Sequence, residues 1–248
     1  MKLIDVSTLN RLADGFEGAP SEEILVWASE ALGPRVAMGT AFGTTGMVLL
    51  DLIQKTVAQM PIFSIDTGFL FGETQDLKAR VEARYGIEIE VIHPRLSVAE
   101  QDRAYGPALY DRNPDRCCWM RKVEPLQRKL AKLDGWITSL RRDQSASRKE
   151  IRVLEPYRVM GGHALVKVNP MAGWTREQVE DYLLENEVPY NPLHDRGYPS
   201  IGCWPCTRPV GAGADERAGR WAGTSKTECG IHTVFVEAAD RGVGEGAG

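Results

Sequence analysis

The sequence lacks the features that place many chains in a class at first sight. Its 248 residues contain neither an internal repeat nor a low-complexity block, and this length allows one large α/β domain, or two small ones, with a substantial core. The first residues, MKLIDVSTLN, hold one lysine and lack the apolar run of about 7–15 residues that a secretory signal needs, and no membrane anchor is visible. We therefore expect a cytoplasmic protein that does not associate with a membrane.

An overall positive charge is also missing. The formal net charge is −4 and the pI is near 5.7, which argues against general affinity for nucleic acid or an anionic membrane. The charge is uneven, since residues 116–152 contain eleven Lys or Arg against four acids. We interpret 128–132 as a solvated helix face, while the remaining cations are suited to a small, multiply charged anion.

Cysteine is scarce, and its placement is uneven. Cys117 and Cys118 are adjacent, Cys203 and Cys206 flank a Trp-Pro dipeptide, and Cys229 stands apart. In a reducing compartment disulfides are disfavoured, and a bridge between neighbours would strain the peptide between them. One interpretation of the thiols is that they are small buried hydrophobes. A second pair, on a turn restricted by proline, favours metal ligands instead.

Hydrophobic patterning predicts alternating strands and helices. Such alternation is typical of a parallel sheet flanked by helices. We expect strands at 35–40, 61–66, 87–94, 135–140 and 164–170, and helices at 21–32, 47–56, 73–86 and 174–188, the last with Thr175 and Gln178 at capping-box spacing.

The composition changes near the carboxyl end of the chain. After residue 210 the sequence is rich in Gly and Ala, which form a core poorly. We therefore expect an α/β domain over 1–214 that binds the ligands, and a mobile segment over 215–248 that contains Cys229.

Three turns should meet at one edge of the predicted sheet. Ligands of α/β proteins bind at the carboxyl ends of the strands, so the turns at 40–46, 66–72 and 140–148 should form one crevice. Backbone amides opening a helix at Gly46 suit a phosphate, although a glycine turn after a strand is common. In 140–147, LRRDQSAS, two arginines with an acid able to orient one of them suit an oxyanion; a solvated turn is the alternative.

Several long segments resemble one family. The runs IDTGFLFGET (65–74), CCWMRKVEPL (117–126), GWITSLRRDQSASR (135–148), PYNPLHDRGYPSIGCWPCTRPV (189–210) and ECGIH (228–232) resemble the assimilatory sulfonucleotide reductases, specifically the iron–sulfur adenylyl-sulfate (APS) reductases. The similarity spans roughly 35–232. It implies an adenine-nucleotide hydrolase-like (PP-loop-like) fold, in agreement with the alternating pattern.

The resemblance implies an iron–sulfur cluster. In the family the paired cysteines bind one four-iron, four-sulfur (4Fe–4S) cluster per chain, which corresponds here to Cys117, Cys118, Cys203 and Cys206; zinc is the alternative metal. Relatives that prefer the 3′-phosphorylated substrate (PAPS) lack these four cysteines, so their presence favours APS. The turn AFGTTG departs from the Ser-Phe-Gly-Ala-Glu-Asp common in the family, so a PAPS or dual-specificity reductase stays as the alternative.

The resemblance makes Cys229 the nucleophile. Its thiolate would attack the sulfur of APS and leave an S-sulfocysteine that thioredoxin resolves. Glu228 beside it disfavours a thiolate, so cations are needed. The substrate-binding set that follows from the motifs is Thr40, Gly43, Thr44, Thr45, Gly46, Asp66, Thr67, Gly68, Lys122, Arg141, Arg142, Arg217, Arg220 and His232; solvated arginines, a surface lysine and a packing histidine are the plain alternatives.

Two other classes compete with a reductase. A PP-loop sulfur transferase would want a Ser-Gly-Gly-x-Asp-Ser turn, which is missing here. A redox sensor without turnover would not need an arginine-flanked cysteine on a separate segment. We also expect a homo-oligomer.

Overall fold

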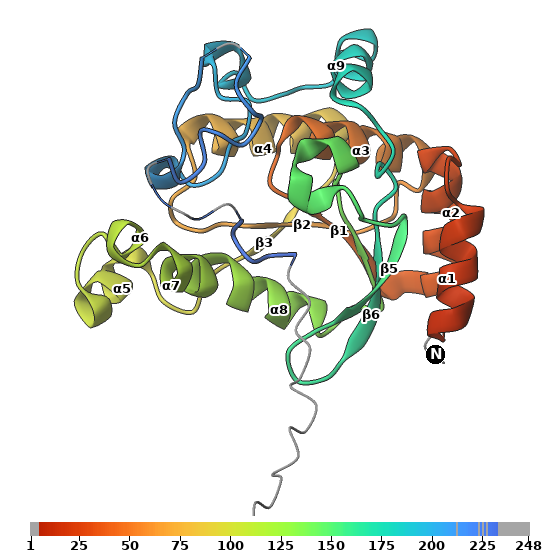
Figure 1. The fold of residues 1–248 in the computed structure, drawn as a ribbon, viewed down its shortest axis with the longest axis horizontal. Helices are drawn as coiled ribbons and strands as arrows, with labels where there is room; N and C mark the ends of the chain where they lie inside the picture. The colour runs from red at the N-terminus through yellow and green to blue at the C-terminus, as the bar shows by residue number, and fades with distance from the viewer. Residues whose placement is uncertain (1–4, 212, 223, 225, 227, 233–248) are drawn as a thin grey trace, which may run out of the picture.

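A six-stranded sheet runs through the middle of the molecule in the order β3-β2-β1-β4-β6-β5 (Figure 1). The computed structural model describes residues 5–211, 213–222, 224, 226 and 228–232. The strands are β1 (Val36–Thr40), β2 (Ile62–Ile65), β3 (Glu90–Ile92), β4 (Gly135–Ile137), β5 (Leu154–Arg158) and β6 (Ala164–Val168). All neighbours pair in parallel except β5 and β6, which are antiparallel.

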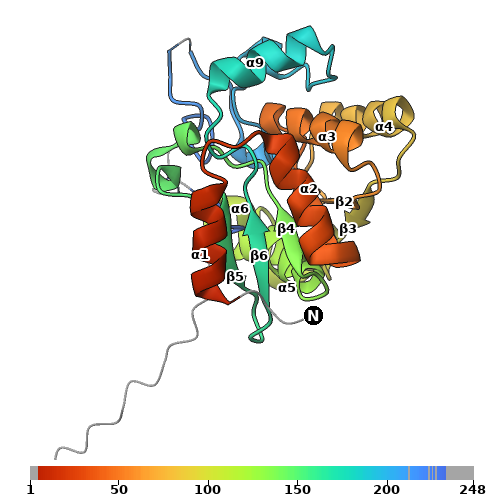
Figure 2. The ribbon, with the colours of Figure 1, turned by 90° about the vertical axis from the view of Figure 1, so that its right-hand side faces the viewer.

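Helices cover both faces of the sheet. They are α1 (Val6–Gly15), α2 (Ser21–Leu32), α3 (Thr44–Thr56), α4 (Gly72–Tyr85), α5 (Val98–Tyr105), α6 (Leu109–Arg112), α7 (Pro114–Cys118), α8 (Glu124–Leu130) and α9 (Arg176–Glu185). Figure 2 shows α1 and α2 beside the sheet, with α3, α4 and α9 above them.

Alternation along the strands produces two hydrophobic cores. In β4, Ile137 packs into the core shared with α1, α2, α3, α4 and α9, whereas the preceding Trp136 packs with Leu126 and Leu130 of α8. This follows from the period of two in a strand, which sends successive side chains to opposite faces. Ile231, near the carboxyl end of the described chain, joins the second core.

The structure confirms the predicted α/β class and adds one strand. β5 lies at the edge of the sheet and contains Pro156, which pairs with Val166 of β6. Proline cannot donate to a strand ladder and is tolerated at sheet edges, so the pattern did not reveal this strand. Helix α3 begins at Thr44 rather than at Gly46, while the predicted capping box of α9 is present, with Thr175 and Gln178 bonded reciprocally.

The strand order places a crevice between β1 and β4. The chain passes from β1 to β2 and β3 on one side, and then returns to β4 and β6 on the other. The turns after β1 and β4 therefore diverge, which opens a space at the carboxyl edge of the sheet.

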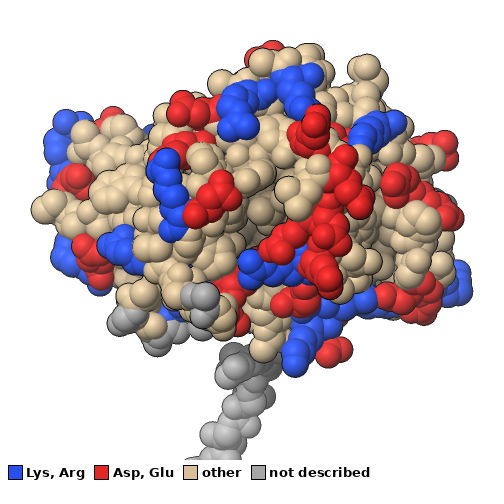
Figure 3. Space-filling model, turned by 90° about the horizontal axis from the view of Figure 1, so that it is seen from above, with Lys and Arg blue, Asp and Glu red and all other residues tan. Residues whose placement is uncertain are grey.

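The surface carries both signs of charge. Figure 3 shows acidic and basic side chains interspersed over the face seen from above, with a run of acids right of centre. Among the described residues, no helix has the length and apolar character needed to cross a membrane.

Candidate active site

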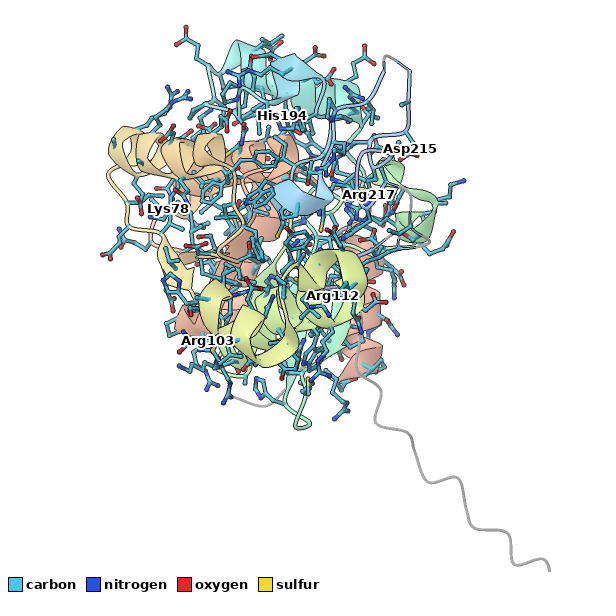
Figure 4. The ribbon with its side chains drawn as sticks, turned by 90° about the vertical axis from the view of Figure 1, so that its left-hand side faces the viewer. Lys78, Arg103, Arg112, His194, Asp215 and Arg217 are labelled. Carbon is cyan, nitrogen blue, oxygen red and sulfur yellow. The ribbon has the colours of Figure 1, made fainter. Side chains whose placement is uncertain are left out.

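A cavity lies at the carboxyl edge of the sheet and is closed on one side by the carboxyl-terminal segment. Its lining comes from residues 39–46 and 199–203, from Phe63, Ser64, Ile65 and Thr67 at the end of β2, from Thr138, Ser139, Leu140, Gln144 and Arg148 after β4, and from Glu216, Arg217, Arg220, Glu228, Cys229, Ile231 and His232. In Figure 4 Asp215 and Arg217 lie on this segment, between the layer with His194 above and helices α5 and α6, with Arg103 and Arg112, below. We call residues 213–232 the arm; its described part lies against the cavity, and its mobility stays a prediction.

The turn after β1 presents the start of helix α3 to the cavity. Gly43 occupies the N-cap position and has no side chain to bond the first amides of the helix. Gly46 lets the helix lie close to β1, because a Cβ there would come within 3.1 Å of Oγ1 of Thr40. The backbone amides and Thr44 at the helix start therefore suit an anionic group.

The two arginines after β4 point in different directions. Arg141 is 1% exposed, and it donates to Oγ1 of Thr45 (2.8 Å), to Asp143 (2.9 Å) and to Glu216 of the arm (3.0 Å). Arg142 instead forms a bidentate ion pair with Glu17 (2.5 and 2.8 Å) at the end of α1. Arg141 thus supports the cavity wall, whereas the structure does not bring Arg142 to the cavity.

The turn after β2 connects the cavity to the cysteines. Asp66 accepts a bond from the amide of Gly68 (2.8 Å) and holds the turn. Gly68 has φ +73°, and a Cβ there would lie 2.8 Å from Val98, so glycine is required. The hydroxyl of Thr67 lies 3.2 Å from the sulfur of Cys203. Of the three predicted residues, Thr67 lines the cavity, and the other two shape the turn.

The adjacent cysteines end a short helix. Asn113 caps α7 by accepting from the amide of Arg116 (3.0 Å), and Pro114 occupies the first turn. A π-helical turn, Trp119–Val123, then leads into α8. Such turns are rare in proteins overall, but a large share of them lies at functional sites. It buries Lys122, which is 8% exposed and lines the cavity.

The second cysteine pair lies on a tight turn held by the arm and by the turn after β2. Residues Trp204–Cys206 form a 3-10 turn, and the amide of Trp204 donates to the carbonyl of Phe69 (2.9 Å). The amide of Trp221 in the arm donates to the carbonyl of Cys206 (3.0 Å). The arm is therefore anchored directly to the cysteine turn.

The chemistry of the four thiols fits a cluster. Burial, together with the neighbouring thiols of Cys118, Cys203 and Cys206, raises the pKa of Cys117 to about 12. Burial also raises the pKa of Cys118 to about 11 and that of Cys206. The three buried thiols of Cys117, Cys118 and Cys203 and the half-buried thiol of Cys206 are a donor set that iron can bind as thiolates. Among the described residues, no three His, Cys, Asp or Glu converge in a single-ion site.

Two cations, Lys122 and Arg220, line the cavity and interact electrostatically both with these thiols and with Cys229. Burial opposes the charge of Lys122, but the thiols of Cys203, Cys229 and Cys118 raise its pKa. The guanidinium of Arg220 lies 4.6 Å from the ring of Trp221 and directly against Gly202, where a Cβ would be 2.2 Å from Nη2. Glycine at 202 therefore makes room for this guanidinium.

Glu228 is neutralised by two arginines. Its carboxylate accepts from Arg148 (3.1 and 3.3 Å) and from Arg217 (2.9 Å). The acid that disfavoured a thiolate at Cys229 thus lies in a group with a net positive charge. Sequence reasoning placed Arg217 here but missed Arg148, although it belongs to the matched run 135–148 and to the basic stretch.

His232 is a packing residue rather than a cation. Its ring stacks on Trp136, with centroids 5.2 Å apart and planes 11° from parallel. Burial and the nearby charges of Lys167, Arg148 and Arg217 lower the pKa of His232 well below its usual range. The ring is neutral near pH 7, so the arginines and Lys122 are the cations that face Cys229.

Sequence comparison identifies the family. Residues 35–209 match the family described as the phosphoadenosine phosphosulfate reductase domain. The chain belongs to this family. A phosphoadenosine 5′-phosphosulfate reductase of Gloeobacter violaceus is 48% identical to this chain, and the alignment covers 92% of this chain and 95% of the relative. An adenosine 5′-phosphosulfate reductase of Halalkalibacterium halodurans is 42% identical, with 90% and 96% covered.

Solved structures agree with the fold and the family. A phosphoadenylyl-sulfate reductase from Candida auris, crystallised with phosphate, has a TM-score of 0.71 and 33% identity, over 83% of this chain and 98% of that one. The FMN adenylyltransferase of Candida glabrata has a TM-score of 0.56 at 14% identity, over 90% of this chain and 75% of that one, and shows the fold alone. These comparisons confirm both the predicted resemblance and the fold class.

Proposed function

We propose that this chain reduces adenylyl sulfate to sulfite and AMP in assimilatory sulfate reduction. The thiolate of Cys229 attacks the sulfur of APS, the bond from sulfur to the phosphate oxygen breaks, and AMP leaves. The sulfonate then remains on Cys229. A dithiol reductant of the thioredoxin type attacks the Cys229 sulfur, releases sulfite and is itself oxidised to a disulfide, so the two electrons balance.

The observation that carries this proposal is the position of Cys229. It lies in one cavity with Lys122, Arg217 and Arg220, opposite the uncapped start of helix α3. The helix start suits the phosphate, and the cations stabilise both the sulfate and the attacking thiolate. A purely structural cysteine would not need this arrangement.

Cys117, Cys118, Cys203 and Cys206 would hold a 4Fe–4S cluster at the wall of this cavity. When bound, the cluster would supply a compact negative charge beside Lys122. The π-helical turn keeps Lys122 buried, and the adjacent Arg121 fixes this turn because its guanidinium donates to Gln101 (3.0 Å) and to the carbonyl of Leu96 (2.8 Å).

The choice of nucleotide is the point on which the relatives differ. The Gloeobacter relative is named for the phosphorylated nucleotide, whereas those of Halalkalibacterium halodurans and Bacillus subtilis, the latter 44% identical over 85% of this chain and 88% of the relative, are named for the unphosphorylated one. The four cysteines favour APS. A PAPS or dual-specificity reductase is the second candidate.

Sulfite release decides between them. With reduced thioredoxin, cluster-loaded protein should have a higher kcat/KM for APS than for PAPS. A higher kcat/KM for PAPS would contradict the substrate assignment, and a lack of sulfite from either nucleotide would contradict the activity. We further propose that the protein is cytoplasmic and that it forms a homo-oligomer. Light scattering tests the oligomeric state.

A further inference from the structure

The carboxylate of Glu228 joins the arm to the body of the protein. It accepts from Arg148, which lies on the segment after β4, and from Arg217, which lies on the arm itself. The side chains of Arg148 and Arg217 are only 12% and 15% exposed, and that of Glu228 is 31% exposed. Without Glu228 both guanidinium groups would lose the carboxylate that they share.

Arg148 is itself fixed to the cavity wall. Its other terminal nitrogen donates to the side chain of Gln144 (2.5 Å), and Gln144 in turn lies 3.5 Å from Oγ1 of Thr45 in helix α3. The contact between Glu228 and Arg148 therefore ties the arm to the segment after β4, which in turn contacts the start of helix α3.

Cys229 follows Glu228 directly in the chain. Consecutive Cα atoms are about 3.8 Å apart, so fixing Glu228 fixes the approach of the thiol to the cavity. On the other side of Cys229, Gly230 has φ +80° and turns the chain inward. The hydroxyl of Tyr157 then donates to the carbonyl of Ile231 (3.4 Å). Cys229 thus lies between the ion pair of Glu228 on one side and Ile231 on the other, which is held by this hydrogen bond and by packing in the second core.

We infer that Glu228 is a positioning residue, whose ion pair with Arg148 closes the arm and holds Cys229 in the cavity. The Arg217 contact balances charge within the arm, and the Arg148 contact supplies the closure. The catalytic consequence rests on the proposed function, but the closure itself does not.

Alkylation of Cys229 by iodoacetamide, followed by the mass of its peptide, measures the closure without any nucleotide. In cluster-loaded protein the rate is recorded against pH. The plateau at high pH, where the thiol is fully ionised, reports access, and the midpoint reports the thiol pKa. We expect Glu228→Gln to raise the plateau about tenfold, as loss of a charge-assisted contact in a partly buried site predicts.

A double-mutant cycle identifies the partner. Arg148→Gln should raise the plateau as much as Glu228→Gln does, and the double variant should add little. Glu177→Gln, the same chemical change on the exposed side of α9, should leave the plateau unchanged. Additive effects, or a shifted midpoint with an unchanged plateau in Glu228→Gln, would overturn the inference, because Glu228 would then act only as a charge near the thiol.

The first turnover separates positioning from binding. With APS and no reductant, Glu228→Gln should release AMP about tenfold more slowly than the wild type, while the affinity for AMP stays within about twofold. If APS yields no AMP with the wild type, the proposed function fails, and the alkylation plateaus still decide the role of Glu228.

Discussion

The cysteine turns and the arm both border the cavity, but they are held in place by different forces. Cys117 and Cys203 are buried in an apolar cluster with Phe69 and Leu109. The arm is held by ion pairs, such as that between Arg141 and Glu216, and by a few apolar contacts, such as the stack of His232 on Trp136. The part that would bind a cofactor is thus embedded, and the part that would present the nucleophile is tied at a few points.

This difference matches what each part has to do. Burial of apolar side chains contributes roughly 1.5–3 kcal/mol each, so the cysteine turns cannot separate without unfolding. An ion pair in a partly buried site gains little net free energy, because both charges lose hydration when they come together, so an arm held by a few such pairs opens at a smaller cost than the cysteine turns do. Under the proposed mechanism a sulfonated Cys229 would leave the cavity to meet a protein reductant, and an arm tied at a few points permits this movement.

The largest effects are expected when one thiol is removed from each of the two regions, the cysteine turns and the arm. Cys229→Ser should abolish the AMP burst and sulfite release, because a serine hydroxyl is far less nucleophilic than a thiolate, yet it should keep about four irons per chain. Cys203→Ser should lose the iron. Iron analysis and quenched-flow measurement of AMP check both.

The pair of variants also tests the assignment of roles. Mass spectrometry after mixing wild-type protein with APS should place one added sulfonate on Cys229. A sulfonate on any other residue, or full iron content in Cys203→Ser, would show that the two regions do not divide the chemistry as described.

A smaller effect is expected from one methyl group at the boundary between the regions. In Gly202→Ala the new Cβ would meet the guanidinium of Arg220 at 2.2 Å. This group ends a flexible side chain, so it moves aside, and the free energy of unfolding should change by less than about 1 kcal/mol. Because the Arg220 guanidinium then leaves its position in the cavity, kcat/KM for APS should fall about 10- to 100-fold.

Gly211→Ala is the matched control, because a Cβ at Gly211 meets nothing within 4 Å. Both variants are compared by thermal unfolding and by sulfite release. An unchanged kcat/KM in Gly202→Ala would mean that Arg220 does not need this position, and equal losses in both variants would point to a general effect on the turn.

The sequence predicted most of the strands and helices in their order along the chain, but not which polar side chains contact one another. Strong periodicity located helix 21–32 to the residue, whereas β5 escaped notice because Pro156 interrupts its pattern. The motifs predicted the same role, substrate binding, for Arg141 and Arg142. Only the backbone direction after β4 decides that one supports the cavity and the other binds Glu17.

The same limit applies to the arm. Glu228 seemed to oppose a thiolate because its partner Arg148 lies 80 residues earlier in the chain. A long-range ion pair leaves no periodic signal in a sequence. His232 seemed a candidate cation for the same reason, since its burial against Trp136 depends on the docked arm.

The smallest expected effect is a pH dependence of arm docking. His232 is neutral when docked, because burial and the charges of Lys167, Arg148 and Arg217 lower its pKa. When the arm is undocked, the imidazole titrates near 6.5. Falling pH therefore adds a proton to the undocked state first, so docking weakens below pH 6.5 and should be about tenfold weaker at pH 5.5 than at pH 7.5.

Hydrogen exchange of arm peptides, expressed as protection relative to the unstructured rate, measures this change. Burial raises the pKa of Glu216, also in the arm, and its protonation favours the docked state, which is the opposite sign. The difference between wild type and His232→Gln isolates the histidine: the variant should lose the decline in protection between pH 7.5 and 5.5. A decline of equal size in both proteins would assign the pH dependence to groups other than His232 and leave His232 with a packing role alone.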